Sequence, residues 1–129
     1  MTFSRIDEST SLQLTRDLAE AAVRGINGSV ADIVASFEAD LGEYLALDPD
    51  LKQEFPRGET ARIYGTALGD ALTRELDLTW QILSDDYGTD LVVADSTGEK
   101  YTAPLIVVDS RFDDDETGKL TAFIDRFLA

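Results

Sequence analysis

The side chains in this sequence best suited to acid–base or metal chemistry are carboxylates. The chain has 129 residues, among them 26 Asp and Glu, and it contains neither His nor Cys. A Ser-His-Asp triad, a thiol nucleophile and zinc sites built from His or Cys are therefore excluded within one chain. Paired carboxylates remain, and these can hydrolyse glycosidic bonds or hold hard cations through oxygen.

Two acidic groups could serve such chemistry. Asp85, Asp86 and Asp90 surround a predicted turn, and Asp109 precedes the acidic run 113–116. Neither group has the ligand spacing of a calcium loop. Turn formation and helix capping are the simpler interpretations, because Asp favours both for structural reasons. We therefore expect no catalytic residues, no cofactor and no metal site, with Asp85, Asp86 and Asp109 as weak candidates for a divalent cation.

A second set of residues is suited to binding. Trp80 is the only Trp and shares a predicted strand face with Leu78 and Ile82, which favours a core position. The alternative is a pocket wall or an interface anchor, because Trp, Tyr and Arg are enriched at binding hot spots. Arg111 has a simpler interpretation, an ion pair with Asp109 or Asp113. The candidate binding residues are Trp80, Asp85, Asp86, Tyr87, Arg111, Tyr64 and Tyr101.

The net charge limits the classes of partner. Lys and Arg total 11, so the formal charge is −15. This charge repels phosphate backbones and anionic lipids, so we expect neither nucleic-acid nor membrane-surface binding. A solubilising surface is the simplest interpretation of the excess acid. The alternative is an acidic face that binds another protein with a basic surface.

Length and hydropathy indicate one domain over residues 1–129, because chains of this size normally form a single core. No stretch approaches the roughly 20 apolar residues of a membrane span. Residues 1–8 lack the apolar segment of a signal peptide, and the absence of Cys fits a reducing compartment. We therefore expect a cytoplasmic location.

Three helices are predicted before the candidate residues. The first begins at a cap among residues 9–11 and ends at Gly25; the second begins at Ser29, with Asp32 completing a capping box. The short Asn-Gly connection predicts an antiparallel helix hairpin. The third helix spans about residues 59–76 and carries a row of small residues, Ala61, Gly65 and Gly69. Glycine costs about 1 kcal/mol inside a helix, so this row predicts close approach of another backbone.

After residue 76 the hydrophobic period changes from 3.6 to 2. Strands are predicted at about 78–83, 91–93 and 101–108, with turns at 85–88 and 95–98. Short turns favour an antiparallel meander. A last helix is predicted over about 115–128, with the acidic run at its N-terminal end. The predicted class is α+β, with three N-terminal helices, a three-stranded antiparallel meander and one C-terminal helix.

The order of motifs in the second half resembles a known family. The motifs are Ile63-Tyr64-Gly65, Leu68-Gly69-Asp70-Ala71-Leu72, Glu75-Leu76, Leu78-Thr79-Trp80, the segment 85–91, Pro104-Leu105 and Arg111. The succession resembles the bacterial family of small acidic domains called domain of unknown function 3806, over residues about 60–112. The resemblance implies a fold and no activity. It singles out Gly69, Trp80, Asp86, Gly88, Pro104 and Arg111.

Composition and size favour a non-enzymatic protein-binding or adaptor domain, similar in profile to immunity proteins and chaperones. The surface we expect to bind lies at the end of the sheet near Trp80, Asp85, Asp86, Tyr87 and Arg111. The alternative is a carboxylate-dependent, divalent-metal-assisted enzyme or a small-ligand binder. The oligomeric state is open between a monomer and a homodimer.

Overall fold

The computed structural model describes residues 1–129 and contains six α-helices and one four-stranded antiparallel sheet, with 60% of the chain helical. The elements in chain order are β1 (Thr2–Arg5), α1 (Glu8–Val23), α2 (Val30–Leu45), α3 (Pro49–Glu54), α4 (Arg57–Leu76), β2 (Thr79–Asp85), β3 (Gly88–Ala94), β4 (Tyr101–Thr102), α5 (Pro104–Ser110), the 3-10 turn η1 (Arg111–Asp113) and α6 (Lys119–Leu128). No helix is both long enough and apolar enough to span a bilayer.

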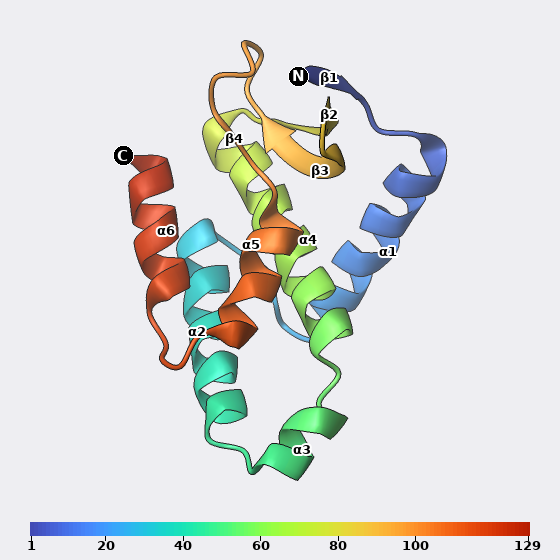
Figure 1. The fold of residues 1–129 in the computed structure, drawn as a ribbon. Coiled ribbons are helices and arrows are strands. Elements are labelled where there is room, and N and C mark those ends of the chain that lie inside the picture. Colours follow the sequence, from blue (N-terminus) through green and yellow to red (C-terminus); the bar gives the residue numbers. More distant parts are fainter.

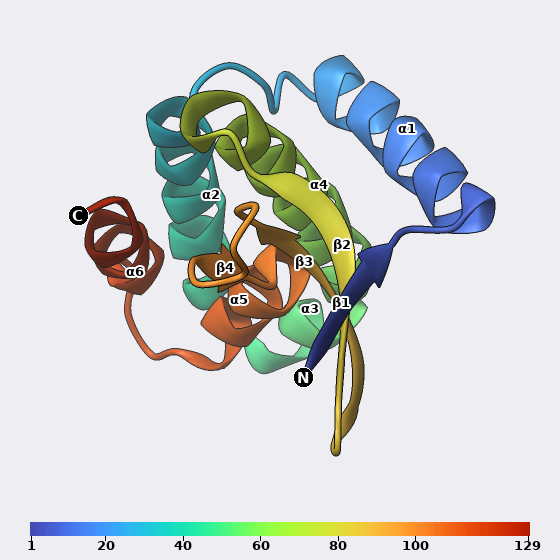
Figure 2. The same cartoon turned by 90° about the horizontal axis from the view of Figure 1, so that it is seen from above.

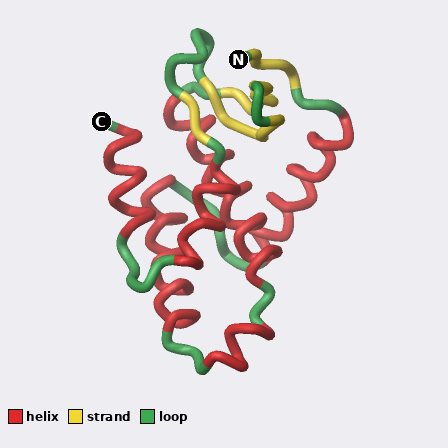
Figure 3. The backbone as a smooth tube through the Cα atoms, in the orientation of Figure 1, coloured by secondary structure: helices red, strands yellow, loops and turns green.

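Helix α4 is the central element of the molecule. Figure 1 shows the sheet at one end of α4 and the short α3 at the other, with α1 on one side and α2 and α6 on the opposite side. All strands gather at one end of the backbone (Figure 3). Eleven residues of α4, from Thr60 to Leu72, are buried, so the other elements are positioned largely by their packing against it.

The capping box predicted for the second helix is confirmed, whereas the cap predicted for the first helix and the pairing of the two helices are wrong. Ser29 accepts a hydrogen bond from the Asp32 backbone N–H, and the Asp32 carboxylate accepts one from the Ser29 N–H, which is the predicted capping box. Asp7, rather than a residue among 9–11, caps α1. Helices α1 and α2 do not form a hairpin, because each packs against α4, which lies between them in Figure 2.

The close approach predicted for the small residues of α4 is confirmed. A Cβ built on Gly65 would lie 2.6 Å from the Leu105 Cα. A Cβ built on Gly69 would overlap the ring of Trp80 and lie 2.9 Å from Pro104 Cγ. The two glycines therefore let α5 and β2 contact the α4 backbone, and this packing offsets their low helix propensity.

The predicted fold class is wrong in its element count and order. The pattern of residues 101–108 predicts one strand, yet only Tyr101–Thr102 is extended and Pro104 begins α5. The β-branched run after Pro104 favours a strand locally. Proline at the first helical position and packing against Gly65 stabilise a helix instead. The sheet gains a fourth strand, β1, which pairs antiparallel with β2.

The C-terminal helix begins later than expected. Its N-terminal cap is Gly118 with φ 104°, so the acidic run 113–116 does not lie in its first turn. Asp114 instead lies 3.1 Å from Arg111 and 4.0 Å from Lys119. Asp114 of the run therefore links η1 to α6 through ion pairs. The predicted interaction of the acidic run with the N-terminal end of the α6 dipole is wrong.

The sheet separates two apolar clusters. Its inner face adds Leu78, Val93 and part of Trp80 to the main core formed by the helices. Its outer face carries a smaller cluster of Leu83, Val92 and Ala94, packed beneath Phe3. This second cluster explains the strand that sequence patterning missed, because β1 places Phe3 directly opposite Leu83.

Candidate functional site

The acidic turn predicted as part of a site forms the exposed tip of the β2–β3 hairpin. Asp85 accepts a hydrogen bond from the Tyr87 N–H at 2.8 Å, and Tyr87 is 99% exposed. Figure 2 shows this hairpin projecting beyond the helices. The interpretation of Asp85 as a turn residue is confirmed, because its carboxylate serves the backbone of the turn itself.

The other acidic and basic candidates lie elsewhere. Asp109 at the end of α5 pairs with Arg57 at 3.3 Å. Arg111 pairs with Asp114, so the prediction of Asp109 or Asp113 as its partner is wrong, because both of these pair with Arg57. No group of three or more acidic side chains is close enough to hold a metal ion. The structure thus does not bring Asp85, Asp86 and Asp109 together, and it does not place Arg111 beside the hairpin tip.

Trp80 and Tyr101 lie on opposite faces of the sheet. Trp80 faces inward, with its ring over Gly69, and is only partly buried, so it contacts the main core and also lines a surface groove. Tyr101 lies on the outer face with its ring edge-on to Phe3 at 5.5 Å. Trp80 is therefore in part a core residue, and its role in binding stays a prediction.

Among the predicted candidate residues, Tyr64 is the one that contacts other polar side chains in a cleft. Its ring is buried in α4 against Phe37, with ring centroids 5.2 Å apart. Its hydroxyl donates to the Asp40 carboxylate and lies 3.1 Å from Ser36 Oγ. Tyr64, Asp40 and Ser36 line a cleft of about 600 Å³, which we call the α2–α4 cleft. It is lined by Arg24, Ile26, Ser36, Asp40, Glu43, Tyr44, Leu47, Phe55, Pro56, Thr60 and Tyr64.

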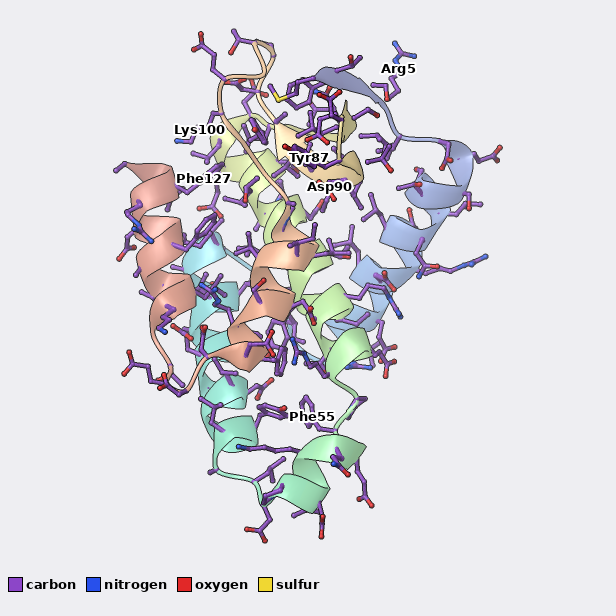
Figure 4. All side chains as sticks on the ribbon, viewed as in Figure 1. Arg5, Phe55, Tyr87, Asp90, Lys100 and Phe127 are labelled. Atoms are coloured by element: carbon purple, nitrogen blue, oxygen red, sulfur yellow. The ribbon has the colours of Figure 1, made fainter.

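Helix periodicity positions the polar wall of the α2–α4 cleft. Ser36, Asp40 and Tyr44 follow one another at intervals of four along α2, which places them on one face. On the facing helix, Thr60 and Tyr64 have the same spacing. Phe55, labelled in Figure 4, closes the cleft from the end of α3, and its ring centroid lies 5.0 Å from that of Tyr44.

The cleft carries more acidic than basic groups. Arg24, its one basic lining residue, is hydrogen-bonded to Glu20 at 2.9 Å and Glu59 at 3.1 Å. Asp40 and Glu43 have no cationic partner within 4.0 Å. Two unpaired carboxylates beside aromatic rings form an environment that attracts a cation.

Burial, followed by the bond to Asp40, raises the pKa of the Tyr64 hydroxyl above its ordinary value. The hydroxyl therefore stays protonated and remains a hydrogen-bond donor at neutral pH. A nucleophile or general base needs the opposite shift, so the Ser36–Tyr64–Asp40 arrangement is suited to holding a ligand.

Sequence reasoning identifies Tyr64 and misses its partners. Asp40, Ser36, Glu43 and Tyr44 are not among the predicted candidates. The signal present is the four-residue spacing of Ser36, Asp40 and Tyr44, which places three polar groups on one face of α2. Its meaning depends on knowing that α4 faces that side of α2.

The family model described as domain of unknown function (DUF3806) matches residues 50–123, which are 74 of the 129 residues. The chain belongs to this family. The resemblance over residues about 60–112 is therefore confirmed and extends from α3 into α6. Tyr64 and Trp80 lie inside the family region, whereas Ser36, Asp40 and Glu43 precede it. No protein with a curated description and no solved structure matches the chain.

Proposed function

We propose that the chain is a non-enzymatic binding module for a protein with a basic surface, and that the α2–α4 cleft receives an Arg or Lys side chain of that partner. The observation that carries this proposal is the pair of carboxylates, Asp40 and Glu43, left without a cation in a cleft walled by Tyr44, Phe55 and Tyr64. Carboxylates attract a cationic group, and aromatic faces add a cation–π contribution.

The distribution of the chain's own bases supports an external cation. Six of the eleven basic residues lie within 4.0 Å of the chain's own carboxylates: Arg24, Arg57, Arg62, Arg74, Arg111 and Lys119. These pairs engage seven of the 26 acidic residues, which leaves 19 without such a partner. The excess charge therefore steers a basic partner toward the molecule.

The aromatic wall of the cleft already interacts with a cation of the chain. The Lys52 ammonium lies 5.7 Å from the centroid of the Tyr44 ring. This contact uses part of the Tyr44 surface at the cleft rim. The same ring chemistry supports recognition of a partner's ammonium or guanidinium group.

Binding rather than catalysis is favoured by the groups that the cleft contains. The Tyr64 pKa is raised, so the Tyr64 hydroxyl stays protonated and serves Asp40 and Ser36 as a hydrogen-bonding partner rather than as a nucleophile or general base. Asp109 does not join Asp85 and Asp86 in a group that could hold a metal ion, so we do not propose metal-assisted catalysis.

Two variants with equal net charge test the proposal. The cleft variant is Asp40→Asn with Glu43→Gln, and the matched control is Asp85→Asn with Asp86→Asn at the hairpin tip. Both variants remove two negative charges from exposed positions. In the cleft variant, the amide oxygen introduced at position 40 can still accept the Tyr64 hydrogen bond. Binding of an oligoarginine peptide is measured by calorimetry at physiological ionic strength.

The cleft variant is expected to bind the peptide about tenfold more weakly than the wild type, which corresponds to about 1.4 kcal/mol. The hairpin control should change the affinity by about twofold or less, because rim and surface charges contribute little once screened. Equal losses in the two variants would mean that only bulk charge attracts the peptide, and would overturn the assignment of the cleft.

A further inference from the structure

We propose that a pocket between α1 and α4 binds a small neutral polyhydroxyl ligand, about the size of a single sugar unit. The pocket, called the α1–α4 pocket below, has a volume of about 260 Å³. It is separate from the α2–α4 cleft, with no lining residue in common, and does not rest on the function proposed for that cleft. Six polar side chains line the α1–α4 pocket: Ser9, Thr10, Gln13, Asp17, Arg62 and Thr66.

The α1–α4 pocket lies where α1 and α4 diverge. Figure 1 shows the two helices close together at the C-terminal end of α1 and farther apart toward its N-terminal end, near the sheet. Residues 9, 13 and 17 follow one another at intervals of four along α1, so they share one face, and residues 62 and 66 share one face of α4. A hydrogen bond from Arg62 to Asp17 joins these two faces. The polar groups of both helices therefore converge on the pocket.

The two charged groups that line the pocket neutralise each other. Asp17 has a buried side chain, 5% exposed, which accepts hydrogen bonds from Gln13 Nε2 at 3.0 Å and from Arg62 Nε at 3.1 Å. A cationic ligand would compete with Arg62 for this carboxylate. An anionic ligand would meet the same carboxylate in a chain whose net charge is −15. The electrostatics of the pocket therefore favour a neutral ligand.

Thr66 adds a buried hydroxyl that the chain does not satisfy. The residue is fully buried, and its Oγ1 has no hydrogen-bond partner within the chain. A buried hydroxyl without a partner is costly, and most buried polar groups in proteins are hydrogen-bonded. A ligand hydroxyl in the α1–α4 pocket would supply the partner that Thr66 lacks.

The polar lining can both donate and accept hydrogen bonds. The terminal nitrogens of Arg62 have no partner in the chain, because the bond to Asp17 uses only Nε. Ser9 and Thr10 contribute hydroxyls, and Gln13 contributes an amide. Each hydroxyl of a polyol also donates and accepts, so a polyol matches this mixture more completely than a ligand that only donates or only accepts.

The apolar lining and the volume fit one sugar unit. Leu14 of α1, Leu91 of β3 and Leu105 of α5 provide the apolar surface, which suits the C–H groups of a sugar. Because a water molecule occupies about 30 Å³ in the liquid, the pocket has the volume of about eight or nine waters. Pockets for drug-sized ligands typically enclose about 300–1,000 Å³, so a smaller ligand is expected here.

Amide chemical shifts of the full isotope-labelled protein, measured by NMR, test the proposal. The neutral probes are D-ribose, D-glucose and sorbitol. Gluconate and glucamine share the carbon skeleton of sorbitol and carry one negative or one positive charge. At least one neutral probe, with about ten to twelve non-hydrogen atoms, is expected to bind with a Kd of about 5 mM or below. It should shift amides of residues 9–17 and 62–66. Gluconate and glucamine should each bind about tenfold more weakly than sorbitol.

Thr66→Val and Thr15→Val provide the matched variants. Both replace a hydroxyl by a methyl group, but Thr66 lines the pocket, whereas Thr15 is exposed on α1 and donates to the Ser11 carbonyl. Thr66→Val is expected to weaken binding of the neutral probe about tenfold. It should leave the thermal stability unchanged or raise it, because no hydrogen bond within the chain is lost. Thr15→Val should leave binding unchanged.

The proposal would be overturned if no neutral probe at about 50 mM shifted the amides around the pocket. Equal binding of sorbitol, gluconate and glucamine would overturn the preference for a neutral ligand. Equal effects of Thr66→Val and Thr15→Val on binding would show that the buried hydroxyl does not contact the probe, and would overturn the site.

Discussion

Tyr64 illustrates how a single buried hydroxyl connects stability with the candidate site. Its ring packs against Phe37 in the core, while its hydroxyl reaches Asp40 and Ser36 in the α2–α4 cleft. Removing the hydroxyl would keep the aromatic packing and leave two polar partners without their bond. The Tyr64 side chain therefore belongs to the core through its ring and to the cleft through its hydroxyl oxygen.

Tyr64→Phe is expected to lower the free energy of unfolding by about 1 kcal/mol, the typical net value of one buried hydrogen bond. Urea denaturation measures the change. Tyr87→Phe is the matched control, because its ring is 99% exposed and its hydroxyl has no bond within the chain, so no change is expected. Equal effects of the two substitutions would contradict the role given to the Tyr64 hydroxyl.

Asp7 links the N-terminal cap of α1 to pH. Its bonds to Thr10 lower the pKa of the carboxyl from 3.8, the value taken for the unfolded chain. A lowered pKa in the folded state gives stability that is present above the unfolded pKa and is lost as pH falls through the folded pKa. Asp7→Asn retains a capping side chain and removes this titration.

We expect the stability difference between the wild type and Asp7→Asn to be constant above about pH 5 and to change below about pH 4, in favour of the variant. Thermal unfolding of both proteins across this range measures the difference. A difference that stays constant down to the lowest pH would contradict the shifted carboxyl as its cause.

At the scale of elements, α4 offers a paired test of close packing. Gly69 and Gly58 both lie in this helix, yet a Cβ on Gly58 would meet nothing within 4 Å, whereas one on Gly69 would meet Trp80 and Pro104. Gly58→Ala is expected to stabilise by up to about 1 kcal/mol through helix propensity. Gly69→Ala should destabilise by about 1–3 kcal/mol through overpacking, despite the same gain in propensity.

Chemical denaturation of both variants gives opposite signs if packing governs the Gly69 position. A neutral or stabilising Gly69→Ala would show that Trp80 and Pro104 move aside at little cost. Trp80 emission provides a second readout, because displacement of its ring from α4 changes its exposure. Gly58→Ala should leave that emission unchanged.

The elements predictable from sequence are those in which local signals and tertiary packing agree. The capping box of α2 is such a case, and so is the small-residue row of α4. Residues 101–108 are the opposite case, since a β-branched run favours a strand and Pro104 is compatible with either a strand edge or a helix start. The contact between Leu105 and Gly65 favours the helix, and the local sequence around either residue does not indicate that contact.

The candidate site is less predictable than the fold. Tyr64 and Trp80 can be selected by residue type, because buried or half-buried aromatics often wall a site. The neighbours of both come from elements distant in sequence. Asp40 reaches Tyr64 from α2, and β1, a strand too short to show a period, contributes Arg5 to the lining of the surface groove that also includes Trp80. Which residues share a cleft is therefore a property of tertiary packing.

At the scale of the whole molecule, excess negative charge opposes compactness. The net charge is −15, and the internal ion pairs engage only part of the acidic residues. Salt has two opposing effects: it screens the repulsion among unpaired acids and it weakens the ion pairs. Surface ion pairs are worth about 0–1 kcal/mol each, so relief of repulsion should dominate.

We expect Tm to rise steadily as NaCl is raised from about 0.01 M to about 0.5 M, over which the screening length falls from about 30 Å to a few ångströms. MgCl2 and CaCl2 at equal ionic strength should give nearly the same Tm, because no cluster of carboxylates is arranged to hold a divalent ion. Scanning calorimetry measures these changes. A rise of several degrees at micromolar Ca²⁺ or Mg²⁺ would instead indicate specific binding to the folded state, since only a bound ion stabilises at such low concentration.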